Sequence, residues 1–159
     1  MTIRYEPPSD FLREAIRCEQ PLATGPEAKQ HVRQLIQLMR DGDTANRDWA
    51  TMLLSQEDID TPEVREALLR ASEDEDDIVR AEALLGLARR DRQLALPLVR
   101  KALSGQRASA PLFEAAAIIA DPSFVADLRD FAVPSGDDLL DRRASAALAA
   151  CEGIARPAS

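Results

Sequence analysis

Apolar residues recur along this chain at intervals of three and four, which is the spacing of helices that bury one face. In residues 25–40, GPEAKQHVRQLIQLMR, the residues that share one side are Ala28, Val32, Leu35, Ile36 and Met39. Pro26 suits the first position of this helix. The pattern repeats in residues 44–55, after Asp43 or Thr44 as the cap, and again after Thr61-Pro62. These segments predict a series of amphipathic helices joined by short turns.

An acidic run at residues 74–77 precedes a further apolar helix, in DEDDIVRAEALLGLARRD. The first turn of a helix carries partial positive charge and unsatisfied N–H groups, so acids there are stabilising, as are arginines at the other end. A calcium-binding EF-hand loop would need a glycine and a distal glutamate at places where this segment has neither. We therefore expect Asp76 or Asp77 to cap a helix, and no cation site.

Further helices are expected downstream. One begins near Gln93, where Pro97 should kink it or delay its start. The next follows Asp121-Pro122, an N-cap acid ahead of a proline in the first helical position. The last covers residues 138–152 and places Cys151 on its apolar stripe.

The glycines indicate a repeat. Gly42, Gly105 and Gly136 each follow an apolar helix and precede a polar turn, and Glu73 occupies the place of a missing member between the first two. The period is roughly 31 to 32 positions, and such a period with two helices per unit is typical of solenoids, in which stacked units share a continuous core. We expect an all-α fold, a right-handed α-α superhelix of about four helix pairs plus a terminal helix.

This organisation fits a single domain over residues 1–159. Residues 1–24 are expected to form an N-terminal cap segment, in which the apolar residues of 8–19 pack against the helix predicted at 25–40. The repeats should occupy residues 25–152, followed by a flexible tail at 153–159.

Residues 76–103, DDIVRAEALLGLARRDRQLALPLVRKAL, resemble a HEAT repeat of the short bacterial kind related to phycobilisome-lyase repeats. The residues that fit the family pattern are Asp77, Val79, Arg80, Ala83, Leu84, Gly86 and Leu87. Arg47 matches Arg80 one unit earlier, and Arg142 matches it two units later. The third unit lacks the arginine and has Pro111, which predicts a shorter first helix there. The resemblance covers about residues 38–152 and implies that the residues of the family pattern are structural and that none of them is catalytic.

Composition narrows the function. Hydrophobic residues make up 45% and aromatic residues only 4%, which favours closely packed helices with small aliphatic side chains. The net charge of −8 opposes the basic surface of a nucleic-acid-binding protein, despite 18 arginines. No apolar stretch approaches the roughly 20 residues of a membrane span, and residues 1–10 lack the apolar segment of a secretory signal. We expect a cytoplasmic protein that binds neither nucleic acid nor membrane.

Catalytic and metal-binding motifs are missing from the sequence. His31 is the only histidine and has no nucleophile motif to serve, and no HExxH, CxxC or glycine-rich phosphate loop occurs. Cys18 and Cys151 are expected to be reduced thiols, and Trp49 a core residue with Met52 and Leu53. We expect no catalytic residue, no cofactor and no metal.

The resemblance implies that the second helix of each unit lines the concave surface of a solenoid. Opposite their apolar stripes, these helices carry the candidate partner-binding residues Arg33, Gln37, Glu63, Glu66, Arg70, Arg100 and Lys101. An ordinary solvated face would also explain these residues. Mixed charges nevertheless suit a protein partner, because they give orientation and selectivity at interfaces.

The sequence therefore predicts a non-enzymatic module that binds a protein partner on its concave face. One specific form is an immunity or inhibitor protein, since an acidic solenoid could neutralise a basic toxin domain. The resemblance also implies an alternative, a bilin-lyase-like tetrapyrrole chaperone or lyase, which would need an apolar cleft with a functional polar group. A HEAT-like DNA glycosylase would need a cationic groove with aromatic residues, and the net charge of −8 argues against it.

Overall fold

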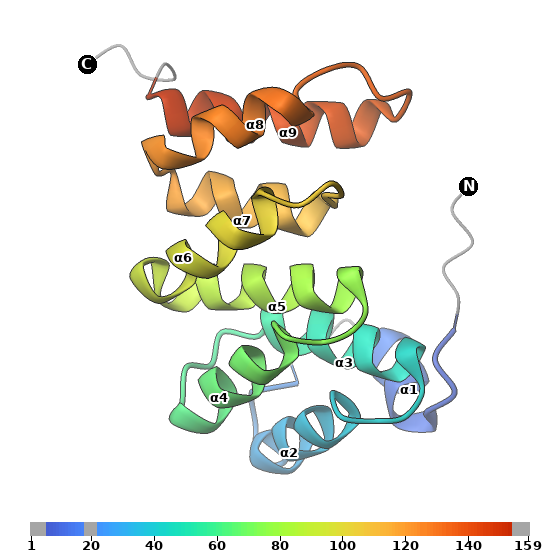
Figure 1. Ribbon diagram of the computed structural model, residues 1–159. Coiled ribbons are helices and arrows are strands. Elements are labelled where there is room, and N and C mark those ends of the chain that lie inside the picture. Colours follow the sequence, from blue (N-terminus) through green and yellow to red (C-terminus); the bar gives the residue numbers. More distant parts are fainter. Residues whose placement is uncertain (1–5, 18–21, 154–159) are drawn as a thin grey trace. The chain divides into compact units, whose positions relative to one another are not determined.

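The computed structural model describes residues 6–17 and 22–153, and every regular element within them is helical (Figure 1). The α-helices are α1 (Asp10–Arg17), α2 (Ala28–Leu38), α3 (Thr44–Gln56), α4 (Pro62–Ala71), α5 (Asp77–Arg90), α6 (Arg92–Leu103), α7 (Ala110–Ile119), α8 (Val125–Phe131) and α9 (Asp138–Glu152), and a short 3₁₀ helix, η1 (Pro122–Phe124), precedes α8. The all-α prediction is confirmed. Within the described residues, the helices follow the expected order of four pairs and a terminal helix.

The chain divides into two compact units, residues 1–83 and residues 84–159, at a point inside α5. Each unit is described by itself. The single domain over 1–159 stays a prediction, as does its division into a cap segment and repeats. Of the expected tail at 153–159, only residue 153 lies within the described residues, and Cys18 lies outside them.

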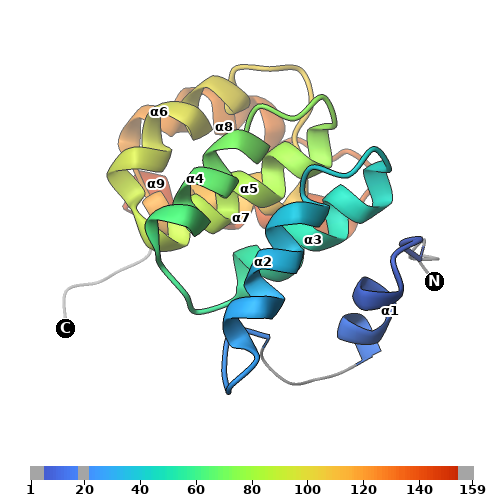
Figure 2. The same ribbon diagram turned by 90° about the horizontal axis from the view of Figure 1, so that it is seen from below.

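In the first unit, α3 packs against α1, α2 and α4, and Figure 2 shows α2 alongside α3. The backbone N–H of Ser9 donates to Oδ1 of Asn46 at 3.0 Å, which ties the start of α1 to α3. The predicted segment also contacts the helix at 25–40 through the rings of Phe11 and His31, whose centroids are 5.9 Å apart. The described part of the segment that we expected to pack against α2 therefore contacts α3 as well.

The core of the first unit is aliphatic. Leu12, Leu35, Leu54, Val64 and Leu68 are fully buried. Trp49 is also buried, as predicted, while Met52 and Leu53 are only half-buried. Small side chains between these residues allow the helices to approach closely, which explains how a chain with few aromatic residues forms a core.

In the second unit, α9 packs against α7 and α8, and α6 packs against α7. Phe113 of α7 meets Phe131 of α8 edge to face, with ring centroids 5.6 Å apart, and Phe124 is fully buried. Cys151 is 3% exposed, which confirms that it is a core residue. The prediction of a shorter first helix in the third unit is also confirmed, since α7 has 10 residues and α5 has 14.

The prolines begin some helices and not others. Pro62 is the first residue of α4, as predicted, but α2 begins at Ala28, two residues after Pro26. Pro122 begins the 3₁₀ turn η1 rather than an α-helix. Pro97 lies inside α6, which begins at Arg92, so the delayed start that we considered is wrong. The side chain of Asp91 fixes that start by accepting the N–H of Leu94 at 3.0 Å.

The helix caps give the length of the repeat more accurately than the glycines do. Asp43 caps α3, Asp76 caps α5 and Ser109 precedes α7, so these three units begin at equal intervals, whereas Asp137 caps α9 after a shorter one. The period predicted from the glycines is an average over these unequal units. The acidic run at 74–77 is therefore a helix start, because Asp76 accepts the N–H groups of Ile78 and Val79 at 2.9 and 3.1 Å.

Arg47 and Arg80, each four residues after its cap, occupy equivalent places. The Nη1 atom of Arg47 donates to the carbonyl oxygen of Asp41 at 3.1 Å, and that of Arg80 donates to the carbonyl oxygen of Asp74 at 2.6 Å. In both cases the acceptor lies six residues before the arginine. Arg142 lies five residues after its cap and, within the described part of the chain, makes no such bond, so its match in sequence is not repeated in structure.

Arg47 is nearly buried, at 8% exposure, and joins two successive turns. Its Nε and Nη2 atoms reach the two carboxylate oxygens of Asp74 at 2.9 and 3.3 Å, and its Nη1 also donates to the carbonyl of Gly42 at 3.3 Å. The hydrogen bond to Asp74 raises the pKa of Arg47, which stays charged. The turn before α3 is thereby fixed to the turn before α5.

Replacing Asp76 by alanine should lower the free energy of unfolding by about 1 kcal/mol, because two N–H groups at the start of α5 lose their acceptor. Urea denaturation followed by circular dichroism measures this. Glu73→Ala serves as the control, since that exposed side chain caps nothing. Equal losses in the two variants would contradict the assignment of the cap.

Replacing Arg47 by methionine should lower the free energy of unfolding by roughly 3–5 kcal/mol, because the largely buried carboxylate of Asp74 loses its cation. The double variant Arg47→Met/Asp74→Leu should recover much of this loss, because it removes both charges. In the control Arg65→Met the lost partner, Asp60, is half-exposed, so we expect a loss below about 1 kcal/mol. The three unfolding free energies form the test, and a double variant no more stable than Arg47→Met would contradict the pairing.

Candidate functional site

All seven residues that we predicted to bind a partner are exposed. In the first unit, Arg33 and Gln37 lie on α2, and Glu63, Glu66 and Arg70 lie on α4. In the second unit, Arg100 and Lys101 lie in the last turn of α6. The seven residues therefore form two groups, one in each unit, and their role in binding stays a prediction.

One of the two predicted residues on α6, Arg100, binds another residue of the second unit. Nη2 of Arg100 donates to Oγ of Ser123 at 2.7 Å, which attaches the end of α6 to η1. The pKa of Asp121 is lowered, mainly because it accepts hydrogen bonds from Ser123, with a smaller contribution from the charge of Arg100. Arg100 thus has a structural partner already.

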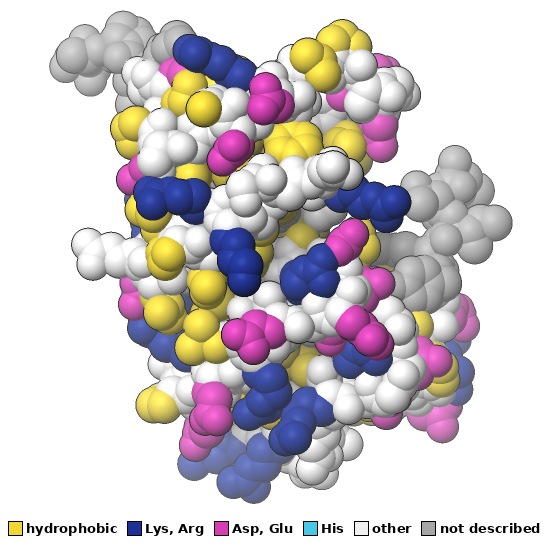
Figure 3. Space-filling model, in the orientation of Figure 1, with side chains coloured by type: hydrophobic (Ala, Val, Ile, Leu, Met, Phe, Trp, Pro, Cys, Tyr) yellow, Lys and Arg dark blue, Asp and Glu magenta, His cyan; other side chains and the backbone are white. Residues whose placement is uncertain are grey.

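On α2 the basic residues follow one side of the helix. Lys29, Arg33 and Gln37 are spaced by four residues, which places them on one face of α2. Arg40 follows the C-cap of α2, three residues after Gln37, and all four side chains are exposed. We call Lys29, Arg33 and Arg40 the α2 basic stripe. Figure 3 shows basic side chains gathered over α2 and α4, at the bottom of the view. Within the described residues, the three cations make no side-chain hydrogen bond or ion pair.

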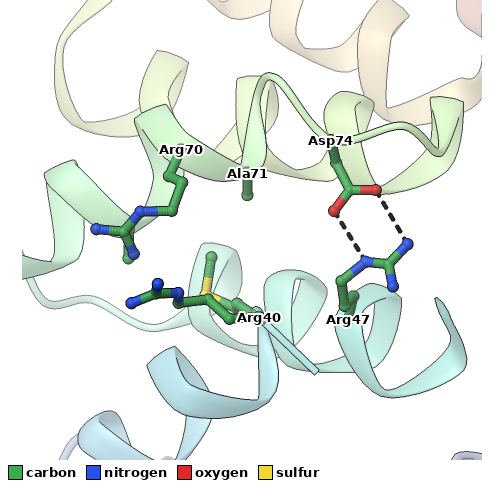
Figure 4. Close-up of a pocket in the computed structure, with 7 residues that line it drawn as sticks. Arg40, Arg47, Arg70, Ala71 and Asp74 are labelled. Carbon is green, nitrogen blue, oxygen red and sulfur yellow. Dashed lines mark hydrogen bonds and ion pairs between the residues drawn. The ribbon is translucent and has the colours of Figure 1, made fainter. Parts of the chain in front are cut away.

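A pocket of about 170 Å³ lies in the first unit, between the end of α2, α3 and α4 (Figure 4). Its apolar lining residues are Met39, Ala67 and Ala71, and its charged ones are Arg40, Arg47, Arg70 and Asp74. The guanidinium groups of Arg40 and Arg70 lie on one side, and the Arg47–Asp74 pair lies on the other. We call this feature the Arg40–Arg70 pocket.

The two sides of the pocket differ in charge. Arg47 and Asp74 neutralise each other through two hydrogen bonds. Among the described residues, Arg70 pairs with the exposed carboxylate of Glu66 alone, at 3.4 Å, and exposed pairs of this kind contribute little to stability. The side formed by Arg40 and Arg70 is therefore positive, next to an apolar floor.

Of the residues that form this pocket, Arg70 was predicted from the sequence to bind a partner, whereas Arg40 was not. The signal for Arg40 was present, since it continues the spacing of Lys29, Arg33 and Gln37. Its approach to Arg70 has no such signal, because the two arginines belong to different helical segments and meet only in the folded unit.

His31 and Cys151 both contact other groups of their own units. Nδ1 of His31 lies 3.2 Å from the carbonyl oxygen of Leu22, and Nε2 lies 3.5 Å from the carboxylate of Glu27. Burial raises the pKa of the Cys151 thiol to about 11, so it is not a reactive nucleophile at neutral pH. Among the residues that the structure describes, no group of three or more His, Cys, Asp or Glu side chains is arranged to hold a metal ion.

In a Cys18→Ser background, Cys151 should react with a disulfide reagent at pH 8 about 100-fold more slowly in the folded chain than in urea, as each pKa unit is tenfold in thiolate. Because the folded pKa lies above the ordinary 9.0, this thiol should also make the folded state less stable as pH rises from about 9 to 11. The rate of thiol labelling and the unfolding midpoint against pH are the measurements. Equal labelling rates in both states would contradict burial of Cys151.

Comparison with known proteins agrees with the repeat structure. The family described as HEAT repeats matches residues 32–117, which is more than half of the 159 residues. Comparison with curated proteins gave no match, and comparison with solved structures gave none either. Within residues 6–17 and 22–153, no helix is both long and apolar enough to cross a membrane. The equally spaced caps, the equivalent arginines and the family match lead to one conclusion: the chain belongs to the HEAT-repeat family.

Proposed function

We propose that this chain is a non-enzymatic protein-interaction module that binds its partner through the exposed faces of its second helices. HEAT repeats commonly serve as interaction scaffolds, and in HEAT-like solenoids the second helices line the concave face. The observation that carries the proposal is the set of exposed charged residues on α2, α4 and α6, opposite apolar faces that are buried.

Mixed charge on these faces supports a protein as the partner. In the first unit Arg40 shares a pocket with Arg70 of α4, and α4 also carries the exposed acids Glu63 and Glu66. A surface with both signs selects partners by orientation, because a wrong arrangement brings like charges together. The cations are nearly all arginines, which bind carboxylates through two parallel hydrogen bonds and are enriched at interfaces.

The specific forms suggested by the sequence have less support. An inhibitor of a basic toxin domain rests on the net charge of −8, whereas the α2 basic stripe favours an acidic partner at that surface. For the phycobilisome-lyase-like alternative, the Arg40–Arg70 pocket, at about 170 Å³, is smaller than the roughly 300–1,000 Å³ of typical cofactor sites. The proposal is therefore restricted to binding a protein partner, and a cytoplasmic location stays a prediction.

A pull-down from the source cell lysate tests this proposal. The variant Arg70→Glu/Arg100→Glu reverses one cation in each unit and should capture at least about tenfold less of the partner that the wild type retains. The control Arg107→Glu/Arg142→Glu makes the same change in net charge at two other exposed positions and should capture a normal amount. Undiminished capture by the first variant would contradict the proposed surface, and the two single variants assign the loss to one unit.

A further inference from the structure

In the described part of the first unit, the cations of the α2 basic stripe make no ion pair, whereas two acids of its turns are held by groups of the fold. The carboxylate of Asp41 accepts the backbone N–H of Asp43 at 2.8 Å and the side-chain amide of Asn46 at 3.2 Å, and these bonds lower its pKa. Asp74 is held by Arg47. Because the turn acids are used inside the fold, they do not neutralise the Arg40–Arg70 pocket, and the local charge differs in sign from the net charge of the chain.

Two guanidinium groups on one side of a pocket repel each other, and an anion between them relieves this repulsion. Arg40 follows the C-cap of α2, and Arg70 lies in the last turn of α4, so the two guanidinium groups come from the ends of different helices (Figure 4). Guanidinium groups bind carboxylates in a planar, two-bond geometry that is stronger than a neutral hydrogen bond. The positive side of the pocket therefore suits a carboxylate.

The floor suits an aliphatic group. Met39, Ala67 and Ala71 are each about one-twentieth exposed, so they form a firm apolar surface rather than a mobile one. The volume of about 170 Å³ resembles that of an engineered cavity of about 150 Å³ that binds benzene. One side chain of the size of leucine can enter the pocket.

We propose that the Arg40–Arg70 pocket binds an acidic segment of a partner protein, with a carboxylate between the two guanidinium groups and a neighbouring aliphatic side chain on the floor. This inference rests on the proposed function and specifies the chemistry of the partner. Lys29 and Arg33 extend the positive surface along α2, which covers about 12 Å from Lys29 to Gln37 at 1.5 Å per residue, with Arg40 beyond its end. An extended segment of about five residues covers this length.

A protein segment fits this surface better than a nucleic acid does. A phosphate backbone carries a charge at every nucleotide, so the exposed Glu63 and Glu66 of α4 would repel it more strongly than a peptide with a few separate carboxylates. Single-stranded nucleic acids also need aromatic side chains on which bases stack, and the lining of this pocket contains none. An acidic peptide meets the cations with separate carboxylates and leaves its aliphatic residue for the floor.

Selection from a random dodecapeptide display library tests the inference. The wild-type chain should enrich peptides in which Asp or Glu neighbours Leu, Ile, Val or Met. A synthetic copy of an enriched peptide should bind the variant Arg40→Glu/Arg70→Glu about 10- to 100-fold more weakly, as expected for lost charge-assisted bonds. The control Arg107→Glu/Arg142→Glu should bind it within about twofold of the wild type. Arg40→Lys/Arg70→Lys should show a smaller loss, because it keeps the charge without the planar geometry.

Several results would overturn the inference. The inference is wrong if the enriched peptides lack acids, if the peptide binds Arg40→Glu/Arg70→Glu as well as the wild type, or if no peptide is enriched. The pull-down decides separately whether a partner binds elsewhere on the second helices. A labelled single-stranded RNA bound by the wild type and lost in the variant would assign the pocket to phosphate instead. Both arginines are exposed, so circular dichroism should show folded variants, and the milder Arg40→Gln/Arg70→Gln replaces any that unfolds.

Discussion

A nearly buried charge is stable only when other groups of the fold bind it. Arg47 satisfies this condition by binding both the turn that precedes α3 and Asp74, which lies 27 residues further along the chain. Its guanidinium reaches two carbonyl oxygens of the turn before α3 and the carboxylate of Asp74 in the turn before α5. The position of α3 relative to the following turn is therefore set by directional bonds, in addition to apolar packing, which is less specific. The ends of α2 and α4 that form the Arg40–Arg70 pocket lie next to these same turns, so the pocket depends on this pairing for its shape.

Much of the fold could be predicted because its signals are local. Asp43, Asp76 and Asp137 cap helices where the sequence places an acid before an apolar pattern. The repeat length was less accessible, because glycines mark the ends of helices loosely whereas caps mark their starts, and the shorter unit before Asp137 lowered the average. Burial of Asn46, Arg47, Thr51 and Ser55 on α3 could not be predicted, since an apolar pattern assigns polar residues to the surface. The approach of Arg40 to Arg70 arises only from packing.

The distribution of charge also differs from what composition suggests. Acids outnumber bases by 28 to 20, yet many acids cap helices or close turns, as Asp43, Asp76 and Asp91 do. Such carboxylates interact with backbone N–H groups and contribute less to recognition. The cations of α2 have no comparable role within the fold. The net charge of the whole chain therefore does not predict the charge of a partner well, and the local surface charge predicts it better.

The constant spacing from Asp43 to Asp76 and from Asp76 to Ser109 bears on how such a chain grows. Each of the first two of these units carries its own cap, its own arginine and, six residues upstream, the carbonyl that the arginine binds. A tandem duplication of one whole unit would insert all three together and keep their register. One duplication of a whole unit therefore lengthens the array without further substitutions at the boundaries between units. A duplication of the shorter unit that ends at Asp137 would not keep this spacing.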